Sequence, residues 1–191
     1  MGELAFYYSS MNSGKSLSLL SKNYMLEEKG FHTVIMKPGM DTRSANSIST
    51  RLGIEKSCIS ISNNRLASEY VLKGSYTRPD FVLIDEAQFL TKEQIWDLSN
   101  LVDHWDINVY CYGLRIDWQG EFFTGSEELF KIADRLETIE NLCTHYKGLP
   151  AYFHIKLGGS NNAVEIGAED LYESVSRKKW REWYSERQTD E

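Results

Sequence analysis

Long apolar runs, a basic leader and a cysteine framework are all missing from this sequence. No apolar stretch approaches the roughly 20 residues that cross a bilayer, so we expect no membrane segment. The strand-like run Leu4–Tyr8 begins almost at once, without a basic leader or cleavage signal. The chain has three cysteines at scattered positions, too few and too dispersed for a disulfide framework. These absences predict a protein of the reducing cytoplasm.

Clustered positive charge is missing too. The formal net charge is −7 at pH 7, and the chain contains no long run of lysine and arginine. A protein that binds duplex nucleic acid usually carries a basic face that displaces counterions from phosphates. The densest basic cluster, Arg177–Arg181, is interleaved with Trp180 and is typical of a solvated helix face. We therefore expect no nucleic-acid partner, while a local site can still bind a small anion.

Short apolar runs alternate with helical patterns in the first two thirds of the chain. The 191 residues are 41% hydrophobic, which suits one α/β domain with a small appendage. We expect strands at Leu4–Tyr8, Thr33–Met36, Phe81–Ile84 and Ile107–Tyr112, the last broken by Gly113. We expect helices from Lys15 to about Lys29, around Arg65–Leu72, and after a capping box of Thr91 and Gln94. Between residues 37 and 80 we expect mainly long loops. The alternation predicts a parallel sheet with helices on both faces.

The chain changes character near Leu136. Beyond it the elements become short, and glycines and paired asparagines appear. We expect a main domain over residues 1–136 and a small lobe over residues 137–191 that ends in a helix. The rings of Trp180, Trp183 and Tyr184 on that helix are expected to pack on the core or on a partner subunit rather than bind a ligand.

A phosphate-binding loop follows the first apolar run. Its residues are Ser9, Ser10, Met11, Asn12, Ser13, Gly14, Lys15 and Ser16. They match the P-loop pattern, with Ser9 in place of the first glycine. Backbone N–H groups at the start of the next helix would cradle phosphate oxygens, and the helix dipole would add partial positive charge. Lys15 would reach the β- and γ-phosphates, and the Ser16 hydroxyl would ligate Mg²⁺. The loop predicts the binding of a nucleoside triphosphate.

Two carboxylates end the apolar run Phe81–Ile84. Asp85 is expected to face the P-loop and to hold Mg²⁺ through water. Neighbouring residues on an extended chain point apart, so Glu86 is available for a different task, that of a general base. It could activate water, as in an ATPase, or take a proton from a substrate hydroxyl, as in a kinase. These residues alone leave both reactions open.

The segment Asp85-Glu86-Ala87-Gln88 also resembles a helicase motif of the DExQ type. A helicase of that type couples two RecA-like domains, and this length holds one. The negative net charge also argues against a nucleic-acid-dependent ATPase. A catalytically idle nucleotide-binding regulator is a third reading. Unstimulated phosphoryl transfer to a small nucleoside would separate a kinase from both.

Several segments together resemble the thymidine kinases of the human cytosolic, bacterial and T-even-phage type. They are residues 7–16, 37–43, 85–90, 112–118, 166–167 and 172–175, in the family's order. The resemblance implies a P-loop, RecA-like fold and the transfer of the γ-phosphate of ATP to the 5′-hydroxyl of thymidine. It makes Glu86 the catalytic base and places Lys15 and Arg115 around the transferring group. The residues that match further motifs near the donor phosphates are Asp41, Arg43, Asp85, Ala87 and Gln88.

The resemblance also implies an acceptor pocket. In the family a loop called the lasso closes over the base, and here it would run from about Leu157 to Tyr172. The residues expected around the base are Met11, Phe89, Leu114, Trp118, Phe123, Ile166, Gly167 and Tyr172. A flat apolar slot suits stacking of a pyrimidine. The resemblance further implies a homotetramer and feedback inhibition by thymidine triphosphate.

The structural zinc site of that family is incomplete in this sequence. Cys143 and His145 could supply two of the four Cys/His ligands that such a site needs. The segment resembling the one that carries the second pair has Ser176 and Lys179 instead. A hydroxyl is a poor zinc ligand and an ammonium is a worse one. We therefore expect Mg²⁺ with ATP, and no structural zinc.

Overall fold

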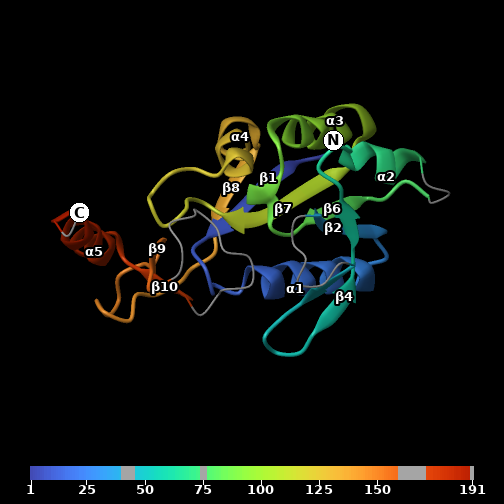
Figure 1. The fold of residues 1–191 in the computed structure, drawn as a ribbon. Helices are drawn as coiled ribbons and strands as arrows, with labels where there is room; N and C mark the ends of the chain where they lie inside the picture. The colour runs from blue at the N-terminus through green and yellow to red at the C-terminus, as the bar shows by residue number, and fades with distance from the viewer. Residues whose placement is uncertain (40–45, 74–76, 159–170, 190–191) are drawn as a thin grey trace.

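The computed structural model describes residues 1–39, 46–73, 77–158 and 171–189. The helices are α1 (Lys15–Glu28), α2 (Ala67–Lys73), α3 (Lys92–Trp105), α4 (Thr124–Ile132) and α5 (Arg177–Thr189), with the 3₁₀ turn η1 (Ala87–Phe89). The first five strands are β1 (Leu4–Ser9), β2 (Thr33–Pro38), β3 (Ser47–Ser49), β4 (Glu55–Ser57) and β5 (Ile59–Ile61). The others are β6 (Phe81–Ile84), β7 (Asn108–Leu114), β8 (Arg135–Thr138), β9 (Phe153–Lys156) and β10 (Tyr172–Val175). Figure 1 shows how they are arranged.

Six strands form one sheet in the order β5-β2-β6-β7-β1-β8. Every pair of neighbours in it is parallel. β7 separates β1, which leads into the P-loop, from β6, which ends at the two carboxylates. Because the strands are parallel, the carboxyl ends of β1 and β6 lie at the same edge of the sheet. The predicted parallel α/β fold is confirmed, and this edge is where ligands bind in such sheets.

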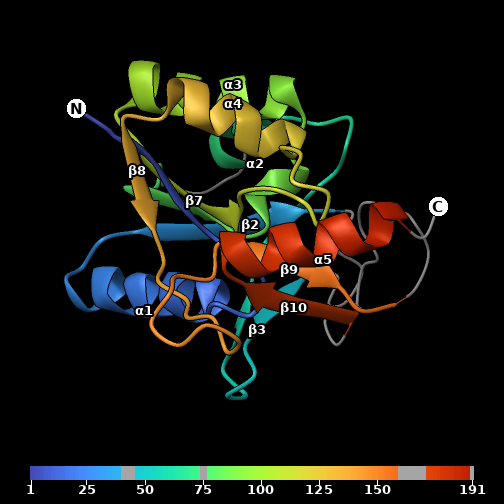
Figure 2. The same ribbon diagram turned by 90° about the vertical axis from the view of Figure 1, so that its left-hand side faces the viewer.

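Alternating side chains of the strands pack into two hydrophobic cores, one on each face of the sheet. Leu4 and Phe6 of β1 pack into the core beneath α2, α3 and α4. Ala5 and Tyr7 face the opposite core, to which α1 contributes Leu19. Figures 1 and 2 show α3 and α4 on one side of the sheet and α1 on the other. The capping box that begins α3 is present as predicted.

Three details differ from the expectations. β7 continues through Gly113, where we expected a break, because Gly113 pairs with Tyr8 of β1. Glycine suits this position, since an added Cβ would lie 2.7 Å from Gln88 Oε1. Three short strands, β3, β4 and β5, lie in the region expected to be mainly loops. The boundary expected between residues 136 and 137 falls inside β8, which belongs to the large sheet.

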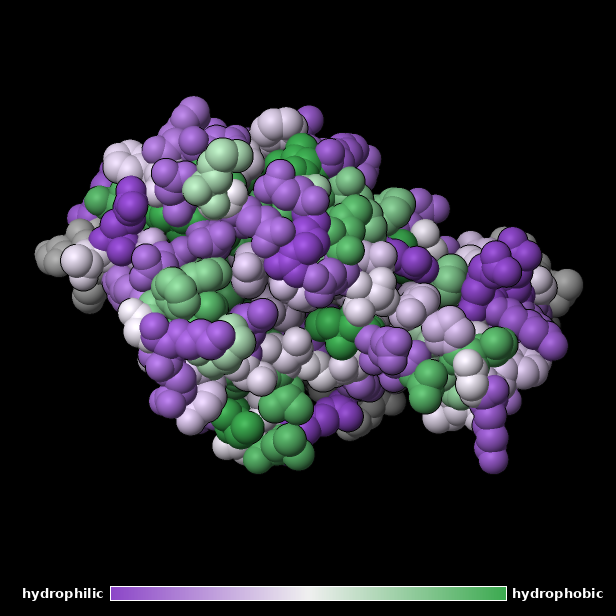
Figure 3. Space-filling view, turned by 180° about the vertical axis from the view of Figure 1, so that it is seen from behind, coloured by the Kyte–Doolittle hydropathy of each residue, from purple (hydrophilic) through white to green (hydrophobic). Residues whose placement is uncertain are grey.

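β3 and β4 pair as an antiparallel hairpin away from the main sheet. The hairpin extends below the body of the molecule in Figure 1. Leu52 and Ile54 near its tip are exposed. Figure 3 shows apolar atoms at this lower end, on a surface that is otherwise mixed.

The chain after β8 forms a small lobe beside the sheet edge that carries the P-loop. β9 and β10 pair as an antiparallel ribbon, and α5 packs on β9. Trp180 and Trp183 of α5 pack against a small core that includes Ile155 and Val175, which agrees with the packing role expected for them. Figure 2 shows α5 lying across the ribbon. Within the described ranges, no helix combines the length and apolar composition that a bilayer crossing requires.

Candidate active site

The loop between β1 and α1 has the backbone of an anion-binding turn. Gly14 caps α1 with φ of 77°, and Asn12 has φ of 58°, so both lie in the left-handed region. That conformation costs glycine little and is tolerated by asparagine. Ser9, which replaces the first glycine of the pattern, is buried at the end of β1, and its hydroxyl donates to the carbonyl of Ile139 at 2.7 Å. Its side chain is thus bonded away from the loop interior.

Lys15 and Ser16 begin α1 inside this loop. Lys15 Nζ donates to the Ser10 carbonyl at 2.7 Å, and the side chain is buried. Ser16 Oγ donates to Asp85 Oδ2 at 2.8 Å, which brings the two expected Mg²⁺ ligands into contact. The buried hydroxyl of Ser13 has no hydrogen-bond partner among the described residues and lines the cavity described below. A phosphate oxygen would supply the acceptor that the Ser13 hydroxyl needs.

Asp85 and Glu86 follow β6 but are held differently. Asp85 is buried, and its Oδ1 accepts from the Glu86 N–H at 3.0 Å. Burial raises the pKa of Asp85, and the neighbouring Glu86 carboxylate adds to this, against hydrogen bonds from Ser16 and Glu86 that lower it. Glu86 has φ of 51°, which turns the chain sharply after the strand. The expectation that the two carboxylates point apart assumed an extended chain, whereas Glu86 lies in the left-handed region and both residues line the cavity described below.

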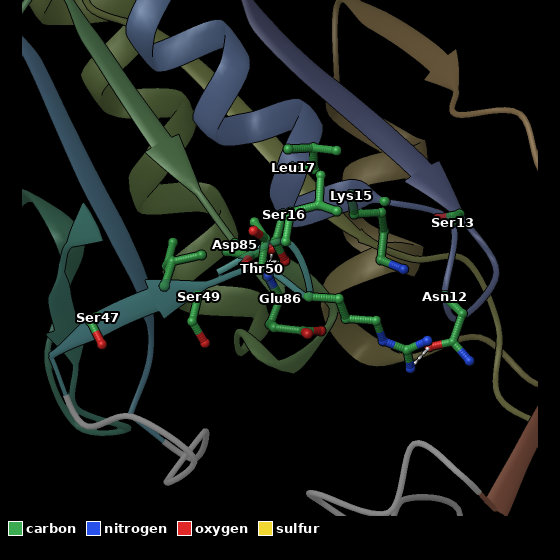
Figure 4. Close-up of a pocket in the computed structure, with 14 residues that line it drawn as sticks. Asn12, Ser13, Lys15, Ser16, Leu17, Ser47, Ser49, Thr50, Asp85 and Glu86 are labelled. Carbon is green, nitrogen blue, oxygen red and sulfur yellow. Dashed lines mark hydrogen bonds between the residues drawn. The ribbon is translucent and has the colours of Figure 1, made fainter. Parts of the chain in front are cut away.

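These groups surround a cavity of about 420 Å³, a size typical of small-ligand sites. Figure 4 shows Lys15, Ser16, Asp85 and Glu86 around it. It is lined by Asn12, Ser13, Gly14, Lys15, Ser16, Leu17, Ser47, Ile48, Ser49, Thr50, Arg51, Leu52, Asp85 and Glu86. The contribution of the β3–β4 hairpin was not predicted. Its serines and threonine carry no spacing pattern, and only the fold brings them opposite the P-loop.

Ala87 and Gln88, expected near the donor phosphates, lie behind the cavity. Ala87 is buried in the core beneath α3. The Gln88 amide donates to Glu86 Oε2, and Gln88 Oε1 accepts from the buried N–H of Leu114 at 3.0 Å. Gln88 thus connects the expected catalytic carboxylate to β7.

The residues expected around the base fall into two groups. The rings of Phe89 and Phe123 meet edge to face, with centroids 5.7 Å apart. Leu114 at the end of β7 is buried, and its carbonyl accepts from Ser126 Oγ. These three side chains come from η1, β7 and the N-terminus of α4, elements that contact one another.

The second group lies toward the small lobe. Trp118 packs edge to face on Trp183, with centroids 5.9 Å apart. Tyr172 packs against His154, whose burial lowers its pKa to about 3. His154 Nδ1 and the Tyr172 hydroxyl are buried without hydrogen-bond partners among the described residues. His154 was not predicted as a site residue, because a lone histidine in a β-like run carries no signal of its own.

Arg115 follows β7 and is half-buried. Its guanidinium lies over the ring of Phe153, 5.1 Å from the centroid. Burial lowers the pKa of this arginine. It is absent from the residues that line the cavity. Four other expected site residues lie outside the described residues: Asp41, Arg43, Ile166 and Gly167. Most of the predicted lasso, residues 159–170, lies outside them too.

The small lobe is hydrogen-bonded directly to the P-loop. The Met11 carbonyl accepts from Ser174 Oγ of β10 and from Asn141 Nδ2, the latter at 3.2 Å. Asn141 Nδ2 also donates to Ser10 Oγ at 3.1 Å, and Ser10 Oγ donates to the Ala151 carbonyl. The P-loop, which lines the cavity, is therefore hydrogen-bonded to the small lobe, where the acceptor is expected to bind.

The two expected zinc ligands point to separate partners. His145 Nε2 lies 2.8 Å from Glu173 Oε1. Cys143 Sγ accepts from the Tyr146 N–H at 3.4 Å. Burial disfavours the Cys143 thiolate, but hydrogen bonds from Tyr146, Ser176 and His145 outweigh it and lower the thiol's pKa. Across the described part of the chain, no group of three or more His, Cys, Asp or Glu side chains is placed to hold a metal ion.

Comparison with known proteins adds an independent finding. A sequence model described as thymidine kinase matches residues 2–180. A thymidine kinase of Idiomarina loihiensis is 40% identical over 191 residues, covering 95% of this chain and 97% of its own. One from Shewanella oneidensis is 39% identical, covering 96% of this chain and 98% of its own. One from Escherichia coli is 37% identical over 190 residues, with 95% and 92% covered.

Proposed function

The chain belongs to the thymidine kinase family, and we propose that it transfers the γ-phosphate of ATP to the 5′-hydroxyl of thymidine, giving ADP and thymidine monophosphate. One observation carries the proposal beyond family membership. Lys15, Ser16, Asp85 and Glu86 line a single cavity at the carboxyl edge of the sheet. This cavity therefore combines phosphate-binding groups with a carboxylate that can accept a proton.

The residues divide the reaction between them. Glu86 takes the proton of the 5′-hydroxyl as the 5′-oxygen forms its bond to the γ-phosphorus. The bond from that phosphorus to the β,γ-bridging oxygen breaks, and ADP leaves. Lys15 balances charge on the transferring group. The oxygens of Ser16 and Asp85 suit Mg²⁺, which would accompany ATP and neutralise phosphate charge.

The acceptor would bind between the aromatic groups and the small lobe. Phe89, Leu114 and Phe123 offer an apolar wall that suits a pyrimidine face. Met11, Trp118 and Tyr172 would complete the wall from the lobe side, and the lasso, with Ile166 and Gly167, would close it. Asp41, Arg43 and Arg115 remain candidates for the donor phosphates through the family resemblance.

The helicase-type alternative is not favoured. The family match extends over almost the whole chain, and the short acidic motif is accounted for by Asp85 and Glu86 in the kinase site. We infer that turnover needs no nucleic acid.

Phosphoryl transfer tests the proposal directly. Purified protein is incubated with ATP, Mg²⁺ and each of the four deoxynucleosides, and monophosphate formation is measured. Thymidine monophosphate is the expected product, and its absence would reject the proposal. Glu86→Gln should fold and bind ATP but lose about 10²–10⁴-fold in kcat, the usual contribution of a general base. Near-normal turnover would remove Glu86 from that role.

We also propose that the small lobe folds without zinc. Cys143 and His145 are engaged with different neighbours, and Ser176 stands near the thiol in place of a strong ligand. The Tyr146 hydroxyl donates to Glu182 Oε1 at 2.7 Å, which ties the loop to α5. Purified protein should contain no stoichiometric zinc by elemental analysis, and a chelator should leave Tm unchanged. One zinc per chain would contradict this.

Homotetramer formation and feedback inhibition by thymidine triphosphate are proposed on family resemblance alone. The native mass from light scattering tests the first. Inhibition of thymidine phosphorylation by added thymidine triphosphate tests the second.

A further inference from the structure

A cationic side chain outside the P-loop reaches the donor cavity. Arg51 lies between β3 and β4 and lines the cavity with its hairpin neighbours Ser49 and Thr50. The P-loop and the carboxylates of Asp85 and Glu86 line the rest. The P-loop and acidic-strand motifs contain no counterpart of this arginine, because the hairpin is contributed by a different part of the chain.

The Arg51 side chain touches the P-loop itself. Its Nη2 donates to Asn12 Oδ1 at 2.7 Å, across 39 residues of sequence. Figure 4 marks this hydrogen bond at Asn12 with a dashed line. Asn12 has a left-handed backbone and precedes Ser13 and Gly14, in the stretch whose N–H groups would face phosphate oxygens. The guanidinium is therefore already at the rim where the terminal phosphates of a donor would lie.

The Arg51 guanidinium can also bind phosphate. In the structure it donates to the amide oxygen of Asn12, at the P-loop stretch that would face the phosphates. A phosphate oxygen carries negative charge, so its hydrogen bonds to a guanidinium are about twice as strong as neutral ones. The planar fork of arginine can also bind two phosphate oxygens at once.

We propose that Arg51 is a phosphate-binding catalytic residue that the β3–β4 hairpin places over the donor. It exchanges its contact with Asn12 for the terminal phosphates of bound ATP and stays on the γ-phosphoryl group during transfer. In that step the bond from the 5′-oxygen to phosphorus forms, the bond to the bridging oxygen breaks, and the hydroxyl proton passes to Glu86. Arg51 stays protonated and stabilises the charge on the equatorial oxygens. This inference rests on the proposed ATP-dependent kinase activity.

Replacement of the guanidinium tests the role. Arg51→Ala should lower kcat/KM for ATP by about 100-fold, the scale of a lost charge-assisted contact in a catalytic site. Arg51→Lys keeps the positive charge but lacks the planar guanidinium, so its kcat/KM for ATP should lie between those of wild type and Arg51→Ala. Added guanidinium ion should restore part of the Arg51→Ala activity, an effect that a purely structural role would not produce.

Lys56 supplies the matched control. It is a cation of the same hairpin, but it pairs with Glu27 at 2.8 Å and does not line the cavity. Lys56→Ala should keep kcat/KM within about 3-fold of wild type, since exposed ion pairs contribute little. Equal loss in Lys56→Ala and Arg51→Ala would overturn the proposal, because it would trace the effect to the hairpin fold. An Arg51→Ala variant with wild-type kcat/KM would also overturn the proposal.

A binding measurement separates this inference from the proposed reaction. Calorimetry with Mg²⁺ and the β,γ-imido analogue of ATP should give about a 10-fold higher Kd for Arg51→Ala than for wild type. If wild type phosphorylates no nucleoside, the proposed function fails, yet this Kd ratio still decides whether Arg51 binds the donor phosphates. An unchanged Kd overturns that role.

Discussion

Gln88 shows how one buried side chain can connect catalysis to the strand framework. Its amide donates to Glu86 and its oxygen accepts from the Leu114 N–H of β7. The side chain is almost fully buried, so water cannot replace either bond. We therefore regard Gln88 as a positioning residue for the carboxylate of Glu86.

Two substitutions separate the roles of Gln88. Gln88→Leu removes both bonds and leaves the buried Leu114 N–H unsatisfied, which should cost about 1–3 kcal/mol of stability. Gln88→Glu keeps an acceptor for Leu114 but places a second carboxylate beside Glu86. Denaturant unfolding should show a loss of stability in both variants, since Gln88→Glu buries a second carboxylate beside Glu86, and kcat should fall at least 10-fold in both, as small misplacement of a reacting group costs this much or more. Unchanged kcat in Gln88→Glu would remove the positioning role.

At the scale of elements, the turn that carries Glu86 is supported from behind by α4. Gly125 in the first turn of α4 lies so close to η1 that an added Cβ would be 2.3 Å from the Ala87 carbonyl oxygen and 3.0 Å from those of Gln88 and Leu90. All three neighbours are backbone atoms, so a side chain at this position must separate α4 from η1. The tight approach fixes the path of the chain immediately after Glu86.

Gly125→Ala should therefore destabilise the protein, although alanine is the better helix former. Overpacking of this kind costs about 1–3 kcal/mol. Gly158→Ala is the control, since among the described residues its Cβ would meet only Leu171, at 3.9 Å. Thermal unfolding should place Tm well below wild type in the first variant and near wild type in the second. Equal Tm values would show that α4 shifts without cost.

Helices and strands that have a recognisable sequence pattern could be predicted, and those without such a pattern could not. Apolar runs in the sequence predict β1 and β6, and a capping box predicts the start of α3. β3, β4 and β5 have three residues each, too few to show a period. Only half of the lining of the proposed donor cavity could be predicted, because the P-loop has a sequence motif and the hairpin carrying Arg51 has none. The break predicted at Gly113 was wrong, because Gly113 pairs with Tyr8 of β1 and has no Cβ to clash with Gln88.

At the scale of the whole molecule, the junction between sheet and small lobe contains a buried histidine. His154 on β9 is almost fully buried, and its pKa falls to about 3 because burial disfavours the charged ring, with Lys15 adding repulsion. The folded protein therefore keeps His154 neutral between pH 3 and its ordinary value of 6.5. In the same range the unfolded chain binds the proton, so stability decreases as pH falls.

A pH series on two proteins tests this. From pH 7 to pH 5, wild type should lose about 2 kcal/mol more of its free energy of unfolding than His154→Phe, given about 1.4 kcal/mol per pH unit below 6.5. Phenylalanine keeps the ring packing on Tyr172 and cannot titrate. Urea unfolding at each pH supplies the difference. Parallel pH profiles for the two proteins would mean that His154 takes up its proton equally in the folded and unfolded states, and so would contradict the lowered pKa.

The contacts at Met11 carry a thermodynamic consequence. One carbonyl of the P-loop accepts from Ser174 and Asn141 of the lobe expected to hold the acceptor, so these hydrogen bonds offer a direct route by which ordering around one substrate can reach the other. Such coupling is reciprocal by necessity: the factor by which thymidine changes the affinity for ATP equals the factor by which ATP changes the affinity for thymidine. The two substrates would then act as effectors of each other, through a loop that is bound by both halves of the enzyme.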